Sequence, residues 1–184
     1  MNRIILAGTF IAAILGLFAF RNISNRFVNK RSFTAAPTGT VYIIVDKSDY
    51  ELQVYDEIGW YATYPVVFGS KSLDDKMIEG DRKTPEGTFR IVNKGPHAKW
   101  HKIMMLDYPT KESWEKFNRR KAMGVISRSA KIGGGIAIHG TWPNDNIVVD
   151  DYTNWTQGCV SLRNADIDEI FSFTPSGTKV MIRK

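Results

Sequence analysis

Short apolar, β-branched runs separated by turn residues are the feature that most constrains the fold of this chain. Residues 41–46 and 51–55 flank the turn 47–50 and predict a β-hairpin. A third strand is predicted over residues 60–68, where Pro65 favours an edge strand or a bend. The other predicted strands cover residues 87–92, 101–106, 135–139 and 178–183.

Only two helices are expected beside these strands. One begins near Thr110 and continues through residues 113–117. The other follows Asn164, a favoured N-cap residue, and acidic side chains in its first turns suit the positive end of the helix dipole. Many strands and few helices predict a mainly β fold, either a β-sandwich or a partly closed barrel, with one or two short helices.

The N-terminal part of the chain differs in composition from the rest. After a short tail of residues 1–3, residues 4–20 are uncharged and mostly apolar. This length is near the lower limit for crossing a bilayer, which predicts a membrane anchor or a signal segment. Residues 21–39 are predicted to be a linker, and residues 40–184 to be one domain.

The charge of the chain is concentrated at the N-terminus. The formal net charge is +6, but five basic residues and no acidic ones lie within residues 1–34. The remainder is therefore almost neutral and lacks the basic footprint of a nucleic-acid-binding protein. No nucleic-acid partner is expected.

The only cysteine of the chain, Cys159, follows Gly158, and His139 lies upstream in the run Ile-Ala-Ile-His-Gly-Thr. A single cysteine excludes an intramolecular disulfide. A cysteine nucleophile needs a base such as imidazole, and a neighbouring glycine lets the backbone approach a carbonyl closely. The pattern predicts Cys159 as nucleophile and His139 as base, with a thiol pKa lowered by the imidazolium, rather than an inert core thiol.

Four segments together resemble the L,D-transpeptidase catalytic domain, also called the YkuD domain. They are the hairpin 42–55, the Thr-Pro-x-Gly-x-Phe signature at 84–89, the glycine-rich run 133–140, and Thr-Gln-Gly-Cys at 156–159. The order and spacing of these motifs carry the resemblance, which covers roughly residues 40–184.

The chain departs from the commonest family pattern at two positions. Gln157 stands where family members often have His, so that Thr-Gln-Gly-Cys replaces Ser-His-Gly-Cys. Ser161 stands where they often have Arg. The family's catalytic base corresponds to His139, which is present, so the departures bear on substrate choice and on the exact reaction.

The resemblance implies a cysteine-dependent acyl transfer on peptidoglycan stem peptides. Cys159 is expected to attack a stem carbonyl and expel the terminal D-Ala, after which an amine of a neighbouring stem takes the acyl group and an L,D cross-link forms. Hydrolysis of the same bonds, by an L,D-carboxypeptidase, an endopeptidase or a lipoprotein–peptidoglycan amidase, is the alternative, and so is a non-catalytic peptidoglycan-binding module. No cofactor is expected, because a thiolate and a base suffice for acyl transfer.

Further site residues are expected around this pair, and of these the resemblance implies the Gly140 carbonyl. The N–H groups of Cys159, Gly158 and Gln157 are the expected oxyanion donors, and the backbone carbonyl of Gly140 is expected to hold the His139 ring. Substrate contacts are expected from Thr156, His101, Trp155 and Arg163, where a turn role for Thr156 and core packing for Trp155 are the alternatives. No metal site is expected, because Pro96 and the strand after His101 argue against a helical ligand face with His97.

This chemistry places the domain in the cell envelope. An inner-membrane anchor facing the periplasm or cell wall is favoured over secretion after signal cleavage, because Phe18 and Phe20 spoil a small-residue cleavage site. More basic residues follow the apolar stretch than precede it, and the positive-inside rule alone would leave the domain in the cytoplasm. The predicted substrate decides in favour of the wall side.

Overall fold

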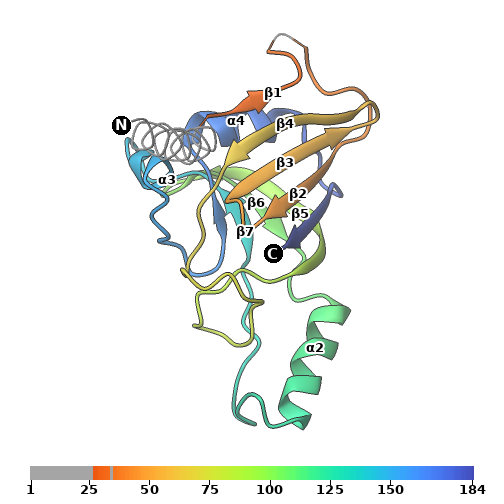
Figure 1. Cartoon of the computed structure of the whole chain (residues 1–184), viewed down its shortest axis with the longest axis vertical. Coiled ribbons are helices and arrows are strands. Elements are labelled where there is room, and N and C mark those ends of the chain that lie inside the picture. Colours follow the sequence, from red (N-terminus) through yellow and green to blue (C-terminus); the bar gives the residue numbers. More distant parts are fainter. Residues whose placement is uncertain (1–26, 34) are drawn as a thin grey trace, which may run out of the picture.

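The computed structural model describes residues 27–33 and 35–184 (Figure 1). The apolar segment 4–20 lies outside these residues, and within them no helix is both long and apolar enough to cross a membrane. The elements in chain order are β1 (Asn29–Lys30), β2 (Tyr42–Asp46), β3 (Glu51–Asp56), β4 (Gly59–Pro65), β5 (Gly87–His97), β6 (His101–Leu106), α2 (Lys111–Ala122), β7 (Ala137–His139), α3 (Ile147–Asp150), β8 (Val160–Ser161), α4 (Asn164–Phe173) and β9 (Lys179–Arg183).

The strands form one sheet in the order β1-β4-β3-β2-β9-β5-β6-β7-β8. Two neighbouring pairs, β2–β9 and β7–β8, are parallel, and the others are antiparallel. β5 belongs to both sections of the sheet, because Gly87–Arg90 pairs with β9 and the rest of the strand pairs with β6. The sequence predicted only the first half of this strand.

The sheet is closed in part by a single bridge. Val67, two residues beyond β4, exchanges two backbone hydrogen bonds of 2.9 Å with Ser161 in β8. β4 and β8 lie near opposite ends of the strand order, so the bridge brings the two ends together. The predicted mainly β fold with few short helices is confirmed, and the partly closed barrel describes it better than two separate sheets.

Alternation along the strands explains where the core lies. In β2 and β3 the apolar side chains at every second position are fully buried: Ile43, Val45, Leu52 and Val54. Each such side chain stabilises the fold by about 1.5–3 kcal/mol relative to an exposed one. α4 packs against β6 and buries Ile167 and Ile170, so it covers the section of the sheet that leads to β7.

The two predicted helices are present, but one cap differs from the prediction. Thr110 caps α2 by accepting a hydrogen bond from the Ser113 N–H at 3.3 Å. Asn164 is not the N-cap of α4 but its first residue, and Arg163 occupies the cap position, where its side chain makes no capping hydrogen bond to the helix. The Asn164 amide oxygen instead accepts from the Thr141 N–H at 2.9 Å, which ties α4 to the loop after β7.

Part of the predicted linker is bound to the domain. Asn29 and Lys30 form β1 and pair with β4 (Figure 1). The Arg31 guanidinium donates to both carboxylate oxygens of the buried Asp56, at 3.1 and 2.6 Å. This bond holds the pKa of Asp56 well below its usual range. Residues 29–31 are thus fixed to the sheet edge before the predicted domain boundary.

Candidate active site

The parallel pairing of β7 with β8 brings His139 and Cys159 together. Ile138 pairs with Val160, and His139 pairs with Ser161. Cys159 directly precedes β8, and side chains alternate along a strand, so Cys159 and His139 point to the same face. Both side chains line one pocket of about 350 Å³. The structure therefore places the predicted nucleophile and base at one site.

The imidazole of His139 is held in one orientation. Its Nδ1 lies 2.7 Å from the Gly140 carbonyl oxygen, which can only accept, so Nδ1 carries the proton. The ring stacks on Trp100, with centroids 4.6 Å apart, and meets the edge of Trp155 at 5.4 Å. The other nitrogen, Nε2, is left as the basic atom. The expected contact between the His139 ring and Gly140 is present.

Burial sets the protonation states of the pair. Desolvation lowers the pKa of His139 to about 4, and it raises the pKa of the Cys159 thiol. The thiol Sγ donates to the Gly135 carbonyl at 3.5 Å. The resting site therefore holds a neutral thiol and a neutral imidazole. The expectation of a thiol pKa lowered by an imidazolium is wrong, because both side chains are buried and desolvation disfavours their charged forms.

Thr156 shapes the loop that carries the cysteine. Its buried hydroxyl accepts from the Gly158 N–H at 3.1 Å and donates to the Cys159 carbonyl at 2.8 Å. Gly158 has φ +125, and a Cβ there would lie 2.7 Å from the Lys83 carbonyl oxygen. Only glycine fits this position without a shift. Thr156 lines the pocket, but its hydrogen bonds are those of a loop support.

Two backbone N–H groups of this loop are available to an oxyanion. In the described part of the chain, the N–H groups of Gln157 and Cys159 donate to no protein acceptor. The Gly158 N–H is already bonded to Thr156, so the prediction that it is an oxyanion donor is corrected. The chain thus offers two candidates, on either side of Gly158, where three were expected.

The signature at 84–89 and the residues just before it abut the cysteine loop. Arg82 donates from Nε to the Thr156 carbonyl at 3.3 Å. The Lys83 carbonyl oxygen occupies the space that a Cβ on Gly158 would need. Asp81 accepts from the N–H groups of Met77, Ile78 and Lys83 and from Lys76 Nζ, which fixes the turn before the signature. Residues 81–83, just before the signature, therefore support the cysteine loop.

Three tryptophans are part of the pocket wall. The lining residues are Lys99, Trp100, Gly135, His139, Trp142, Trp155, Thr156, Gln157 and Cys159. Trp142 and Trp155 lie with centroids 3.9 Å apart, and both line the pocket, so substrate contact by Trp155 stays a prediction. Lys99 and Trp100 were missed from the sequence. The pairing of β6 with β7 beside His139 brings this turn to the pocket.

Two predicted contact residues lie outside the pocket. His101 Nε2 is 2.8 Å from Asp168 on α4, and Arg163 binds Asp150 and Asp166. Both side chains therefore hold elements together rather than line the site, which corrects their predicted role in substrate contact. Among residues 27–33 and 35–184, no three His, Cys, Asp or Glu side chains are grouped so as to hold a metal ion.

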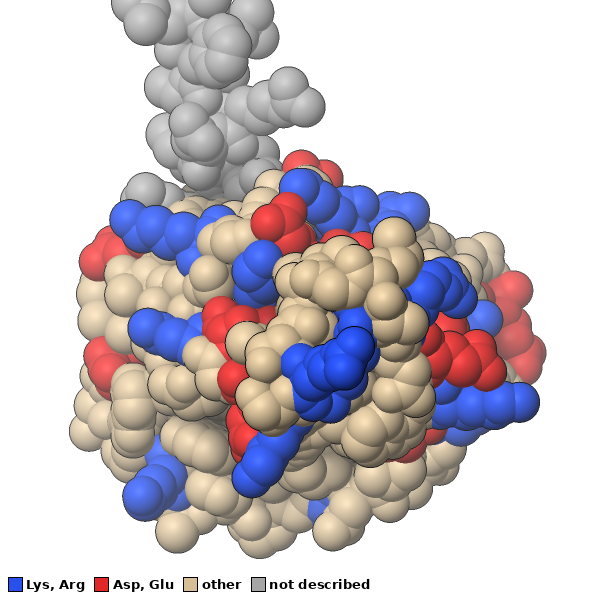
Figure 2. All heavy atoms as spheres, turned by 90° about the horizontal axis from the view of Figure 1, so that it is seen from below, with Lys and Arg blue, Asp and Glu red and all other residues tan. Residues whose placement is uncertain are grey.

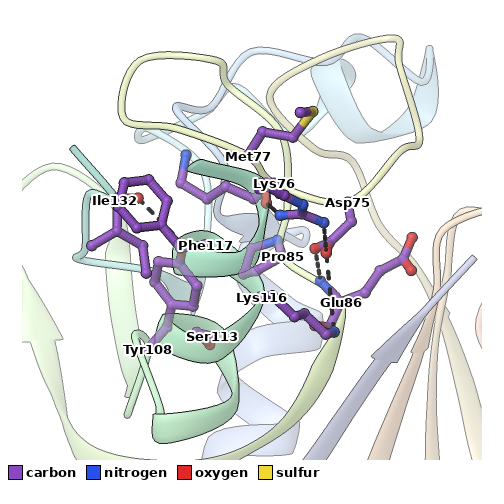
Figure 3. Close-up of a pocket in the computed structure, with 11 residues that line it drawn as sticks. Asp75, Lys76, Met77, Pro85, Glu86, Tyr108, Ser113, Lys116, Phe117 and Ile132 are labelled. Atoms are coloured by element: carbon purple, nitrogen blue, oxygen red, sulfur yellow. Dashed lines mark hydrogen bonds and ion pairs between the residues drawn. The ribbon is translucent and has the colours of Figure 1, made fainter. Parts of the chain in front are cut away.

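A second pocket lies against α2 and is of a different kind (Figure 3). Its volume is only about 10 Å³. Asp75 accepts from Arg120 at 2.7 Å, and Lys116 donates to the Glu86 carbonyl at 3.1 Å. The charged groups in this pocket are paired, and none of the predicted catalytic residues lines it.

Comparisons with known proteins agree with this geometry. Residues 40–182 match the model of the L,D-transpeptidase catalytic domain, YkuD. The fold and the site together define a class of protein, a β-rich domain with a cysteine and a histidine in one pocket. The chain belongs to the YkuD L,D-transpeptidase catalytic domain family. The comparison with curated proteins found no match.

Solved structures show the same fold. The cell-shape-determining protein Pgp2 from Campylobacter jejuni is 25% identical, with a TM-score of 0.58 over 79% of this chain and 48% of that one. Bd1075 from Bdellovibrio bacteriovorus is 20% identical, with a TM-score of 0.56 over 86% and 52%. A mutant Enterococcus faecium L,D-transpeptidase is 17% identical, with a TM-score of 0.50 over 80% and 50%.

The chain therefore spans about half the length of these relatives.

Proposed function

We propose that this protein is a cysteine acyltransferase that forms L,D cross-links between peptidoglycan stem peptides. The observation that carries the proposal is that the Cys159 thiol lines the same pocket as the His139 imidazole, whose Nδ1 is fixed by the Gly140 carbonyl. A binding module would need neither a thiol nor an oriented base. The wider family resemblance supplies the substrate class.

The first half-reaction follows from the neutral resting pair. As Cys159 Sγ attacks the stem carbonyl, its proton moves to His139 Nε2, and the new oxyanion meets the N–H groups of Gln157 and Cys159. The C–N bond to the terminal D-amino acid then breaks. His139 returns the proton to the departing amine, which leaves a thioester on Cys159 and a neutral imidazole.

The second half-reaction reverses these proton movements. An amine of a neighbouring stem attacks the thioester and gives its proton to His139, and the C–S bond breaks to restore the thiol. With water as the acceptor, the same steps make the enzyme a carboxypeptidase. No cofactor enters either step, because the nucleophile, the base and the oxyanion donors all belong to the chain.

The proposal places the domain on the wall side of the cytoplasmic membrane, with residues 4–20 as its anchor. The substrate class supports this placement, since peptidoglycan lies outside that membrane. This placement is tested by labelling Cys159 with a membrane-impermeant thiol reagent in cells whose outer membrane has been permeabilised and whose inner membrane is intact. Labelling only after the inner membrane is lysed would reject it.

Muropeptide analysis tests the reaction itself. Purified sacculi are incubated with the wild-type protein and, as a matched control, with Cys159→Ala. New L,D cross-linked dimers in the wild-type sample alone support the proposal. Shortened stems without new dimers show hydrolysis instead, and unchanged muropeptides in both samples reject an enzyme acting on this substrate.

A further inference from the structure

The turn between β5 and β6 is rigid and presents two side chains to the pocket. His97 Nδ1 accepts from the backbone N–H groups of Lys99 and Trp100, at 3.2 Å each. The His97 ring stacks on Trp100 with centroids 4.5 Å apart, and Trp100 stacks on His139. The turn is thus fixed by the same row of rings that orients the catalytic base.

The base of the turn is attached to α4. His101 has φ +61, and its Nε2 contacts Asp168, which also pairs with Lys102 at 2.5 Å. These contacts fix both ends of the segment 97–102. Lys99, between them, therefore projects from a backbone that needs no ordering when a ligand binds.

Lys99 is the one permanently charged side chain among the residues that line this pocket. It is exposed, and it forms no ion pair with any residue that the structure describes. His139 is neutral near pH 7, since its pKa is lowered to about 4. The pocket thus carries one positive charge at an otherwise aromatic and uncharged wall.

Two positions shortly after the cysteine offer no free cation to the pocket. Ser161 occupies a position near the cysteine, is neutral, and donates to the Gly140 carbonyl at 3.3 Å. Arg163 is engaged by Asp150 and Asp166. Lys99 is therefore the cation that lines the pocket itself, while Arg82 lies behind the loop and donates to the Thr156 carbonyl.

We infer that Lys99 is a specificity-determining residue that pairs with a carboxylate of the acyl-donor stem. The inference rests on the proposed function and names a feature of its donor. A stem offers two sources for this group, the terminal carboxylate of the departing residue and the side-chain carboxylate of a diamino acid. The same ion pair fits either source, and donors that lack one of them tell them apart.

Binding to the Cys159→Ala protein tests the inference without turnover. The probes are a tetrapeptide stem with free carboxylates, the same stem amidated at its C-terminus, and the same stem amidated at the diamino-acid side chain. Quenching of the pocket tryptophans reports the dissociation constant. In the Lys99→Gln background the free stem is expected to bind about three- to tenfold more weakly, as for one partly exposed ion pair.

One of the two amidated stems should bind the Cys159→Ala protein equally well with Lys99 and with Gln at position 99. The carboxylate that is blocked in that stem is the one that Lys99 binds. Lys99→Arg should restore affinity for the free stem, and Lys131→Gln, an exposed lysine outside this pocket, should leave it unchanged. In the active enzyme, Lys99→Gln should raise KM with little change in kcat.

An equal effect of Lys99→Gln on all three stems, or no effect, overturns the inference while leaving the proposed function intact. Absence of binding by any stem overturns both. Binding that depends on Lys99, in a protein that turns over no stem, overturns the proposed function alone.

Discussion

The pocket at Cys159 and the pocket against α2 differ in the charge of their lining residues and in the space that they enclose. At Cys159, stacked rings and backbone carbonyls hold uncharged groups around open space of about 350 Å³. Against α2, the space is about 10 Å³, and Asp75, Arg120 and Lys116 satisfy one another (Figure 3). Figure 2, which looks onto the end that carries α2, shows basic and acidic side chains intermixed.

The difference shows which of the two pockets has side chains available for a reaction. A charged side chain that is already paired is less available to a ligand, whereas a neutral thiol and a neutral imidazole that line one pocket are suited to proton transfer. We therefore assign reaction to the first pocket and stability to the second. Changes at the first should alter turnover, and changes at the second should alter the free energy of unfolding.

The largest expected effect is on turnover, from His139→Gln. Glutamine cannot accept the thiol proton near neutral pH, so kcat/KM for a stem donor should fall about 10²- to 10⁴-fold at pH 7. Steady-state kinetics measure the loss, and slow alkylation of Cys159 at high pH serves as a control for an intact thiol. Turnover close to wild type would place the base elsewhere.

The second prediction concerns the shape of the cysteine loop. Gly158→Ala forces a Cβ to within 2.7 Å of the Lys83 carbonyl at φ +125, so the loop must shift. We expect a loss of about 3 kcal/mol in the free energy of unfolding, together with a strong loss of turnover. Urea denaturation gives the first value. An unchanged midpoint would show that the loop is looser than the structure indicates.

The third prediction uses the pKa of His139. Because the native pKa is about 4 and the unfolded value is near 6.5, the unfolded chain binds the proton first as the pH falls. Stability from this group is present above pH 6.5 and declines toward pH 4, with about 2 kcal/mol lost between pH 6.5 and pH 5.

Denaturation at pH 6.5 and pH 5 measures this change, and His139→Gln is the reference that removes it. The reference is needed because burial raises the pKa of Asp166 to about 6, which adds stability as the pH falls. An equal pH dependence in both proteins would show that His139 is solvated in the native state.

The smallest expected effect comes from the pocket against α2. Asp75→Asn removes the charge that Arg120 and Lys116 share, and we expect a loss of about 1 kcal/mol in stability because the pairs are only partly buried. The kcat should stay within about twofold of wild type. A large loss of turnover with normal stability would break the division between the two pockets.

The sequence predicted the strands with clear alternation, the two longer helices and the Cys159–His139 pair. It did not predict β1, β8 and α3, because segments of two to four residues depend on the partners they pair with rather than on their own pattern. Asn164 was assigned to the wrong cap position because its side chain bonds to a distant loop.

The rest of the site depends on tertiary contacts. Lys99 and Trp100 lie in a turn, and only the pairing of β6 with β7 directs that turn toward His139. The pKa directions of Cys159 and His139 follow from burial, which local sequence does not contain. The engaged Gly158 N–H follows from the fold of the Thr156 loop.

The most direct test of the account is mass spectrometry of the acyl-enzyme. The protein is mixed with a tetrapeptide stem donor, quenched in acid within the first turnover and mapped by peptide. The account predicts a tripeptide acyl group on Cys159 in the wild-type protein, and none in Cys159→Ala. Released D-amino acid from the wild-type protein without any adduct on Cys159 would contradict it.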